Sequence, residues 1–84
     1  MTIEQIEKFI DLHARNNLQP VKISFKARNQ LNGIFIRASD YDELKKKNFW
    51  RIVTSTRLDS YRQSKDLSHT RMFNGAEFTK LSLQ

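Results

Sequence analysis

The side chains best suited to chemistry in this sequence are basic and aromatic residues that follow one another in two stretches. The stretch "KKKNFWR" places three lysines directly ahead of two aromatic rings and an arginine, namely Lys45, Lys46, Lys47, Phe49, Trp50 and Arg51. Lysines neutralise phosphates and release counterions, while an exposed aromatic face stacks a nucleobase. The stretch therefore has the composition of a surface that binds single-stranded nucleic acid.

Only one of the two rings in this stretch can be available to a ligand. Phe49 and Trp50 are neighbours in an expected strand, and successive side chains of a strand point to opposite faces. We take Trp50 as the candidate stacking platform. The alternative is that Trp50 is a core residue and that the lysines only solubilise a loop.

A second basic stretch begins six residues after Arg51, in the polar segment "RLDSYRQSKDLSH" and the strand after it. Its basic side chains surround one tyrosine, and the candidate binding residues are Arg57, Tyr61, Arg62, Lys65 and Arg71. The alternative is a flexible charged loop with no specific role.

The charge of the chain is unevenly distributed. The net charge is +6, but residues 1–20 carry −1 and residues 21–84 carry +7. A basic body of this kind favours an anionic partner, and nucleic acid is the commonest one. A basic surface without such a partner is the alternative.

The residues that catalysis or a cofactor would need are scarce. The two histidines, His13 and His69, lie far apart in the chain, and the carboxylates of "DYDE" are typical of a solvated loop. The only glycines, Gly33 and Gly75, cannot form a phosphate-binding glycine loop. We therefore expect neither an enzyme nor a metal or other cofactor.

Other features of the sequence indicate which cellular compartment to expect. The chain has no cysteine, so disulfides and thiolate metal sites are excluded. The start "MTIEQIEKFI" lacks the pattern of a signal peptide, and no apolar run reaches membrane-spanning length. These features predict a cytoplasmic protein that makes no contact with a membrane.

The first element expected from the pattern is a helix over residues 2–16. Thr2 and Gln5 have the spacing of a capping box, and Pro20 prevents the helix from continuing. An apolar stripe at intervals of three and four residues comprises Ile3, Ile6, Phe9, Ile10 and His13. Asn16 and Asn17 suit a left-handed helix end, and His13 is expected at the half-buried end of the stripe.

The rest of the chain predicts short strands between residues 21 and 83. Strands are expected at "VKISFK", "IFIRA", "FWRIVTST", "TRMF" and "AEFTKLSL", with a bend or bulge at Gly33. Residues 39–48 are expected as a polar loop that can contain one helical turn, and residues 57–69 as a long loop or protruding hairpin. Asn74-Gly75 is a strong hairpin signal, but the apolar spacing after it also fits a sharply bent turn that closes a small barrel.

Two stretches resemble the motifs of the Sm and Hfq family. In "MFNGAEFTKLSL" the apolar residues around Gly75 follow the family's second motif, and "VKISFKARNQLNGIFIRASD" follows the first. The resemblance implies a helix packed on five bent antiparallel strands, with ring assembly through edge strands. Asn74 stands where the family commonly has an arginine, and no asparagine follows Asp40 at the family's uracil-reading position. The resemblance therefore does not imply that this chain binds uridine tracts.

Together these patterns predict one domain over residues 1–84, mainly β with one N-terminal helix, as a five-stranded bent antiparallel barrel of Sm-like or SH3-like type. Other α+β arrangements remain open. The expected core comprises Ile6, Ile10, Val21, Ile23, Ile34, Ile36, Phe78 and Leu81. The expected function is binding of RNA or single-stranded DNA with little sequence preference. The alternative is a non-catalytic interaction module that pairs through an exposed strand edge, with itself or with a partner.

Overall fold

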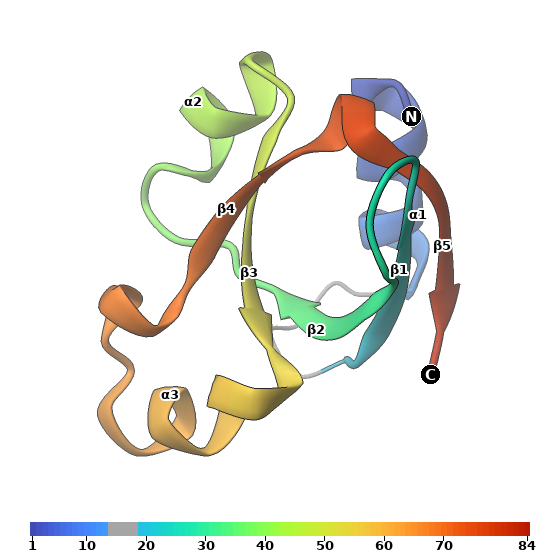
Figure 1. Cartoon of the computed structure of the whole chain (residues 1–84). Helices are drawn as coiled ribbons and strands as arrows, with labels where there is room; N and C mark the ends of the chain where they lie inside the picture. The colour runs from blue at the N-terminus through green and yellow to red at the C-terminus, as the bar shows by residue number, and fades with distance from the viewer. Residues whose placement is uncertain (14–18) are drawn as a thin grey trace.

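The computed structural model describes residues 1–13 and 19–84 and contains one five-stranded antiparallel sheet. The strands are β1 (Val21–Phe25), β2 (Leu31–Phe35), β3 (Phe49–Thr54), β4 (Arg71–Asn74) and β5 (Phe78–Leu83). Their order across the sheet is β4-β3-β2-β1-β5. Figure 1 shows these strands bending around a shared centre. The expected antiparallel sheet of five strands is confirmed.

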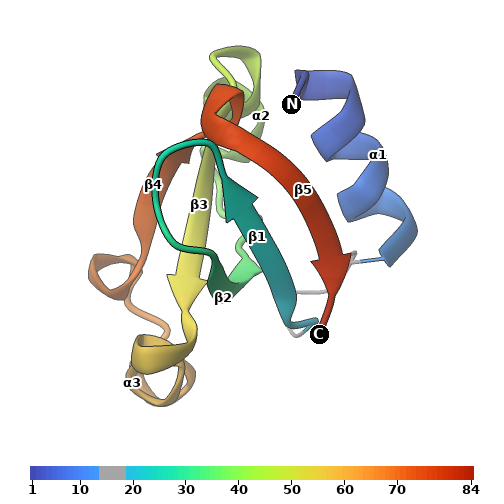
Figure 2. The same ribbon diagram turned by 45° about the vertical axis from the view of Figure 1, so that its right-hand side comes forward.

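The helix at the start of the chain, α1 (Ile3–His13), begins at the predicted capping box. The backbone N–H of Thr2 donates to the side-chain oxygen of Gln5 at 2.9 Å, and the N–H of Gln5 donates to the Thr2 hydroxyl at 3.2 Å. Ile6 and Ile10 are buried, whereas His13 is exposed rather than half-buried. The helix end expected at residues 14–16 lies outside the described residues. Figure 2 shows α1 running beside β5.

Helical segments occupy both regions that were expected to be irregular, so the chain is mixed α/β rather than mainly β with a single helix. α2 (Tyr41–Lys46) lies between β2 and β3. Between β3 and β4 the chain forms α3 (Leu58–Ser64), flanked by the 3-10 turns η1 (Ser55–Arg57) and η2 (Leu67–His69). The expected loop or hairpin at residues 57–69 is therefore wrong.

The main core lies between the concave side of the sheet and α1. It contains Ile6, Ile10, Val21, Ile23, Phe35, Trp50, Ile52, Phe73, Phe78 and Leu81. All eight residues predicted for the core are buried. Burial of these apolar side chains is the main favourable term in folding such a small domain.

A second, smaller core lies on the other face of β2 and β3, beneath α3. Leu58 and Tyr61 are three residues apart and so share one face of α3, which packs on Ile34, Ile36 and Val53. Because Phe35 belongs to the main core, three consecutive residues, 34 to 36, are buried on alternating sides. The short apolar run "IFI" is thus explained by two covered faces of one strand.

The connection from β4 to β5 is not a hairpin. β4 pairs with β3 and β5 pairs with β1, so the two strands lie at opposite edges of the sheet. They are joined by the 3-10 turn η3 (Gly75–Glu77), in which the Asn74 side chain accepts a hydrogen bond from the N–H of Ala76 at 2.9 Å. Gly75 has no positive φ. The Asn-Gly signal correctly marked a turn, and of its two interpretations the hairpin is excluded.

Replacing Ile10 by Ala is expected to lower the free energy of unfolding by about 2–4 kcal/mol, because its fully buried side chain would leave a cavity between α1 and the sheet. The matched control is Leu12→Ala on the same helix, where the side chain is 64% exposed. The control should change stability by no more than about 0.5 kcal/mol. Urea denaturation measures both variants, and equal midpoints would show that α1 is not docked.

Candidate nucleic-acid interface

The sequence-predicted binding residues fall into two groups that the fold keeps apart. The three lysines lie in α2 or directly after it, just before β3 begins. Arg57 and the α3 residues follow the end of β3. A strand of six residues spans about 20 Å, so one basic group lies at each end of β3. Figure 1 shows α2 in the upper part of the picture and α3 in the lower part, near the two ends of this strand.

Two of the predicted binding cations are already paired within the protein. The Lys45 ammonium binds the Glu7 carboxylate of α1 and lies 3.7 Å from Asp42. The hydrogen bond with Glu7 raises the pKa of Lys45 above its ordinary value. The Arg51 guanidinium donates to Asp40 at 2.6 Å and to the Thr70 hydroxyl at 2.8 Å. These two residues hold elements together, which leaves Lys46 and Lys47 as the exposed lysines at this end of β3.

Trp50 does not form a stacking platform, so that expectation is wrong. Its side chain is 1% exposed, and the indole N–H donates to the Asn48 side-chain oxygen at 2.7 Å. The ring packs edge-on against Phe35 and Tyr41. Its neighbour Phe49 is 38% exposed and carries the outward ring of the pair.

Tyr61 is likewise unavailable for base stacking. It is 9% exposed because it anchors α3 on the second core. The Lys65 ammonium lies 5.8 Å from the centre of its ring. Arg62 of α3 and Lys65, which directly follows α3, stay exposed, so they remain candidate phosphate contacts, but Tyr61 offers them no ring for base stacking.

The fold creates a polar pocket that the sequence patterns did not single out. It lies where η1 and η2 approach the start of β4, and its volume is about 410 Å³. Its lining residues carry hydroxyl, imidazole or guanidinium groups and comprise Thr54, Thr56, Arg57, Ser68, His69, Thr70 and Arg71. No carboxylate belongs to this described lining.

The polar groups around the pocket are held by local hydrogen bonds. The Thr54 and Thr56 hydroxyls lie 3.1 Å apart, and the Thr70 hydroxyl donates to the Leu67 carbonyl at 2.6 Å. The nearby Asp66 carboxylate accepts from the Ser68 N–H at 2.9 Å as the cap of η2. This hydrogen bond lowers the pKa of Asp66, so its negative charge is directed to the backbone of η2.

Two arginines give the pocket its positive charge. Arg57 and Arg71 are exposed, and neither forms an ion pair within the described parts of the chain. The Arg71 guanidinium lies 5.7 Å above the Phe73 ring. Guanidinium groups bind phosphate oxygens through paired hydrogen bonds. The arrangement suits an anion with several acceptor oxygens.

A sequence signal for this pocket was present but weak. The segment between β3 and β4 is bounded by "TSTR" and "SHTR", so each end carries a hydroxyl residue directly before an arginine. The two ends meet only because α3 folds back on the buried Tyr61 and the partly buried Leu58. A segment interpreted as a loop gives no reason to expect that its ends meet.

Other site types find no support in the described residues. Residues 1–13 and 19–84 contain no group of three or more histidine, cysteine or acidic side chains placed to hold a metal ion. Within the same ranges, no helix is long and apolar enough to cross a membrane. Comparisons with protein-family models, curated proteins and solved structures found no match.

Trp50→Ala is expected to reduce the free energy of unfolding by about 3–5 kcal/mol, as loss of a buried aromatic ring does. Phe49→Ala is the matched control, because it removes a neighbouring ring that faces outward. The control should cost no more than about 1 kcal/mol. Chemical denaturation followed by circular dichroism compares the two, and a stable Trp50→Ala protein would contradict the assigned core role.

Proposed function

We propose that this chain is a small non-catalytic barrel module that binds RNA or single-stranded DNA through backbone phosphates, with little sequence preference. The observation that carries the proposal is the polar pocket with two arginines that have no ion-pair partner in the described residues and no carboxylate in its lining. Phosphate contacts supply most of the sequence-independent affinity for nucleic acid.

An Sm-like or SH3-like barrel is the form of this fold that we propose. Two features support it. β4 and β5 are consecutive strands at opposite edges of the sheet, joined by a single 3-10 turn. The N–H of Lys26, just after β1, donates to the carbonyl of Glu77 in η3 at 3.0 Å, which ties the loop after β1 to the turn between β4 and β5.

A non-catalytic role is favoured by the way the pocket is built. His69 is its one titratable base in the described lining, and no hydrogen bond joins the imidazole to a hydroxyl among residues 1–13 and 19–84. A nucleophile paired with a base is the minimum for covalent catalysis. The pocket offers donors for an anion, which is what a binding site requires.

Replacing Arg57 and Arg71 together by Gln is expected to weaken binding of single-stranded oligonucleotides of any base composition. The salt dependence should flatten by about 1.4 in the slope of log K against log salt, because each single-strand phosphate contact contributes about 0.7. Fluorescence anisotropy with a labelled RNA at several salt concentrations measures this slope.

The matched control changes the same net charge elsewhere, by Lys8→Gln on α1 together with Lys80→Gln on β5. It should retain most of the affinity and slope. If the intact protein binds no better at low salt than an unrelated basic protein, the nucleic-acid proposal is wrong.

The alternative function is self-association through strand edges. It is favoured by exposed apolar side chains on both edge strands, Met72 of β4 at 57% and Leu83 of β5 at 46%. Two different edges of one sheet can pair head to tail, and such heterologous contacts form rings when the rotation closes.

If the edges pair, light scattering should give a mass above that of one chain, and Met72→Lys should shift it towards the monomer, because a charged side chain disfavours edge pairing. Lys46→Met, which removes a charge from α2, is a control that should not change the mass. A monomer at high protein concentration would exclude this alternative without affecting the phosphate proposal.

A further inference from the structure

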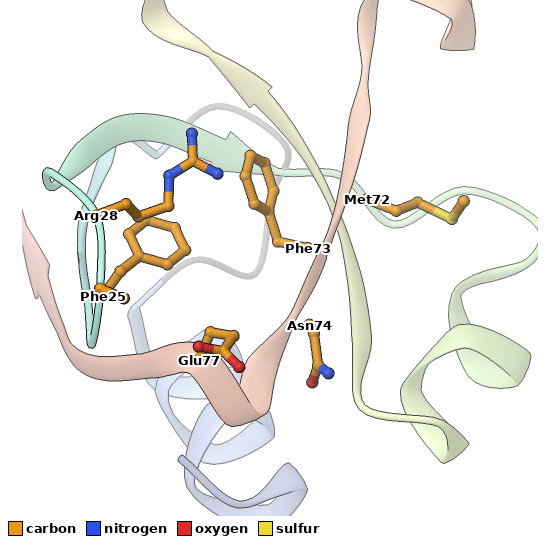
Figure 3. Close-up of a pocket in the computed structure, with 7 residues that line it drawn as sticks. Phe25, Arg28, Met72, Phe73, Asn74 and Glu77 are labelled. Carbon is orange, nitrogen blue, oxygen red and sulfur yellow. The ribbon is translucent and has the colours of Figure 1, made fainter.

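A second pocket lies at the other end of β4, between that strand, η3 and the loop after β1. Its volume is about 260 Å³. Six residues that line it are labelled in Figure 3: Phe25, Arg28, Met72, Phe73, Asn74 and Glu77. Nothing proposed above assigns a role to it.

The floor of this pocket is aromatic and is partly covered by a guanidinium. The Phe25 and Phe73 rings pack at 5.7 Å between centres, and the Arg28 guanidinium carbon lies 5.2 Å and 5.5 Å from those centres. Figure 3 shows the guanidinium beside both rings, with the Met72 side chain pointing away from them. Arg28 is exposed and forms no ion pair within the described residues, so one side of its planar group can accept a ligand.

The wall of the pocket beside η3 is polar. The Asn74 side-chain oxygen is used by the Ala76 N–H, so its amide group is left as a donor. The Glu77 carboxylate is exposed and has no hydrogen bond or ion pair among residues 1–13 and 19–84. An ionised carboxylate only accepts hydrogen bonds. A ligand group that reaches the Glu77 carboxylate must therefore present hydrogen-bond donors, whereas the Asn74 amide can donate to an acceptor beside it.

These contacts restrict the chemistry of the occupant. A cationic side chain is disfavoured because guanidinium groups of Arg28 and Arg71 already lie over the rings. A purely aliphatic side chain would leave Glu77 desolvated without a partner. A flat, uncharged ring with donors on its edge fits both the guanidinium plane and the carboxylate, and nucleobases stack on arginine planes in this way.

Arg71 connects this pocket to the phosphate pocket. It lines the polar pocket, and its guanidinium also lies over Phe73. Residues 71 and 73 are separated by about 7 Å along an extended strand, a span that a single nucleotide can bridge. A strand held by its phosphate at Arg71 would therefore place a base near Phe73 and Arg28.

We propose that the pocket formed by Phe25, Arg28, Phe73 and Glu77 binds a guanine base of the same single strand whose phosphate is held at Arg57 and Arg71. The inference rests on the proposed function and adds one base contact to it. The base stacks on the Arg28 guanidinium, which is backed by the two rings. Guanine presents two adjacent donors, N1–H and the N2 amino group, and a carboxylate can accept both. The other bases place an acceptor beside each donor, and that acceptor repels the Glu77 oxygens.

The test uses short labelled RNAs of one backbone that carry guanine, adenine or an abasic site at one central position. The intact chain should bind the guanine RNA about 5- to 150-fold more tightly than the abasic RNA, the range expected for one stacked base. Glu77→Gln should reduce the preference for guanine over adenine, because an amide offers one acceptor and one donor. Arg28→Lys keeps the positive charge but removes the planar guanidinium on which the base would stack. It should therefore reduce the preference for the guanine RNA over the abasic RNA.

Glu43→Gln on α2 is the matched control for charge and should leave both ratios unchanged. Thermal unfolding of each variant confirms that it folds. Equal binding of guanine and abasic RNAs by the intact chain would overturn the base pocket and leave the phosphate proposal intact. A preference that Glu77→Gln and Arg28→Lys do not change would also overturn it. Absence of binding to every RNA at low salt would refute the proposed function, and the base pocket with it.

Discussion

The arrangement of this domain depends on one polar junction around Asn48, just before β3. Its backbone has φ of 59°, a left-handed conformation that asparagine tolerates better than most residues. Its side-chain oxygen accepts from the Trp50 indole, its amide donates to the Met1 carbonyl at 3.3 Å, and its own carbonyl accepts from the Gly75 N–H at 2.7 Å. A side chain on Gly75 would collide with Asn48, Ile6 and Trp50. One residue therefore joins the start of the chain, the core and the turn between the two edge strands.

This junction also helps to position the two pockets beside β4. It fixes the end of β4, while the salt bridge from Arg51 to Asp40 and its hydrogen bond to Thr70 fix the segment that enters β4. β4 is an edge strand with one neighbour, so its other side is left for the two pockets. The polar pocket lies at its beginning and the aromatic pocket at its end. A short edge strand held at both ends is a rigid support for the single strand that we propose runs along it.

The sequence allowed much of the scaffold to be predicted but little of the site, and the reason is physical. Periodic burial is a local property, so α1, four of the five strands and all eight core residues could be inferred from spacing. The exception is β2, which begins at Leu31 and runs through Gly33, where a bend or bulge was expected. The sequence could not show which of Trp50 and Phe49 faces the core. Alternation places their side chains on opposite faces of the strand but does not indicate which face is buried. The pockets combine segments that are distant in the chain, such as Phe25 with Phe73. Only the tertiary structure brings such residues together.

The net charge is likewise a poor guide to where an anion binds. Lys45, Arg37 and Arg51 are among the cations of the basic body, yet they form ion pairs with Glu7, Asp11 and Asp40 that fasten α1, α2 and the sheet. A paired cation must give up its partner before it can hold a phosphate, and the exposed carboxylate left behind repels the ligand. Positive charge available to a ligand is therefore concentrated on residues outside these pairs. In the described part of the chain, Arg57 and Arg71 combine that availability with a pocket of hydroxyl donors, which is why we propose the phosphate site beside β4 rather than at the lysine run.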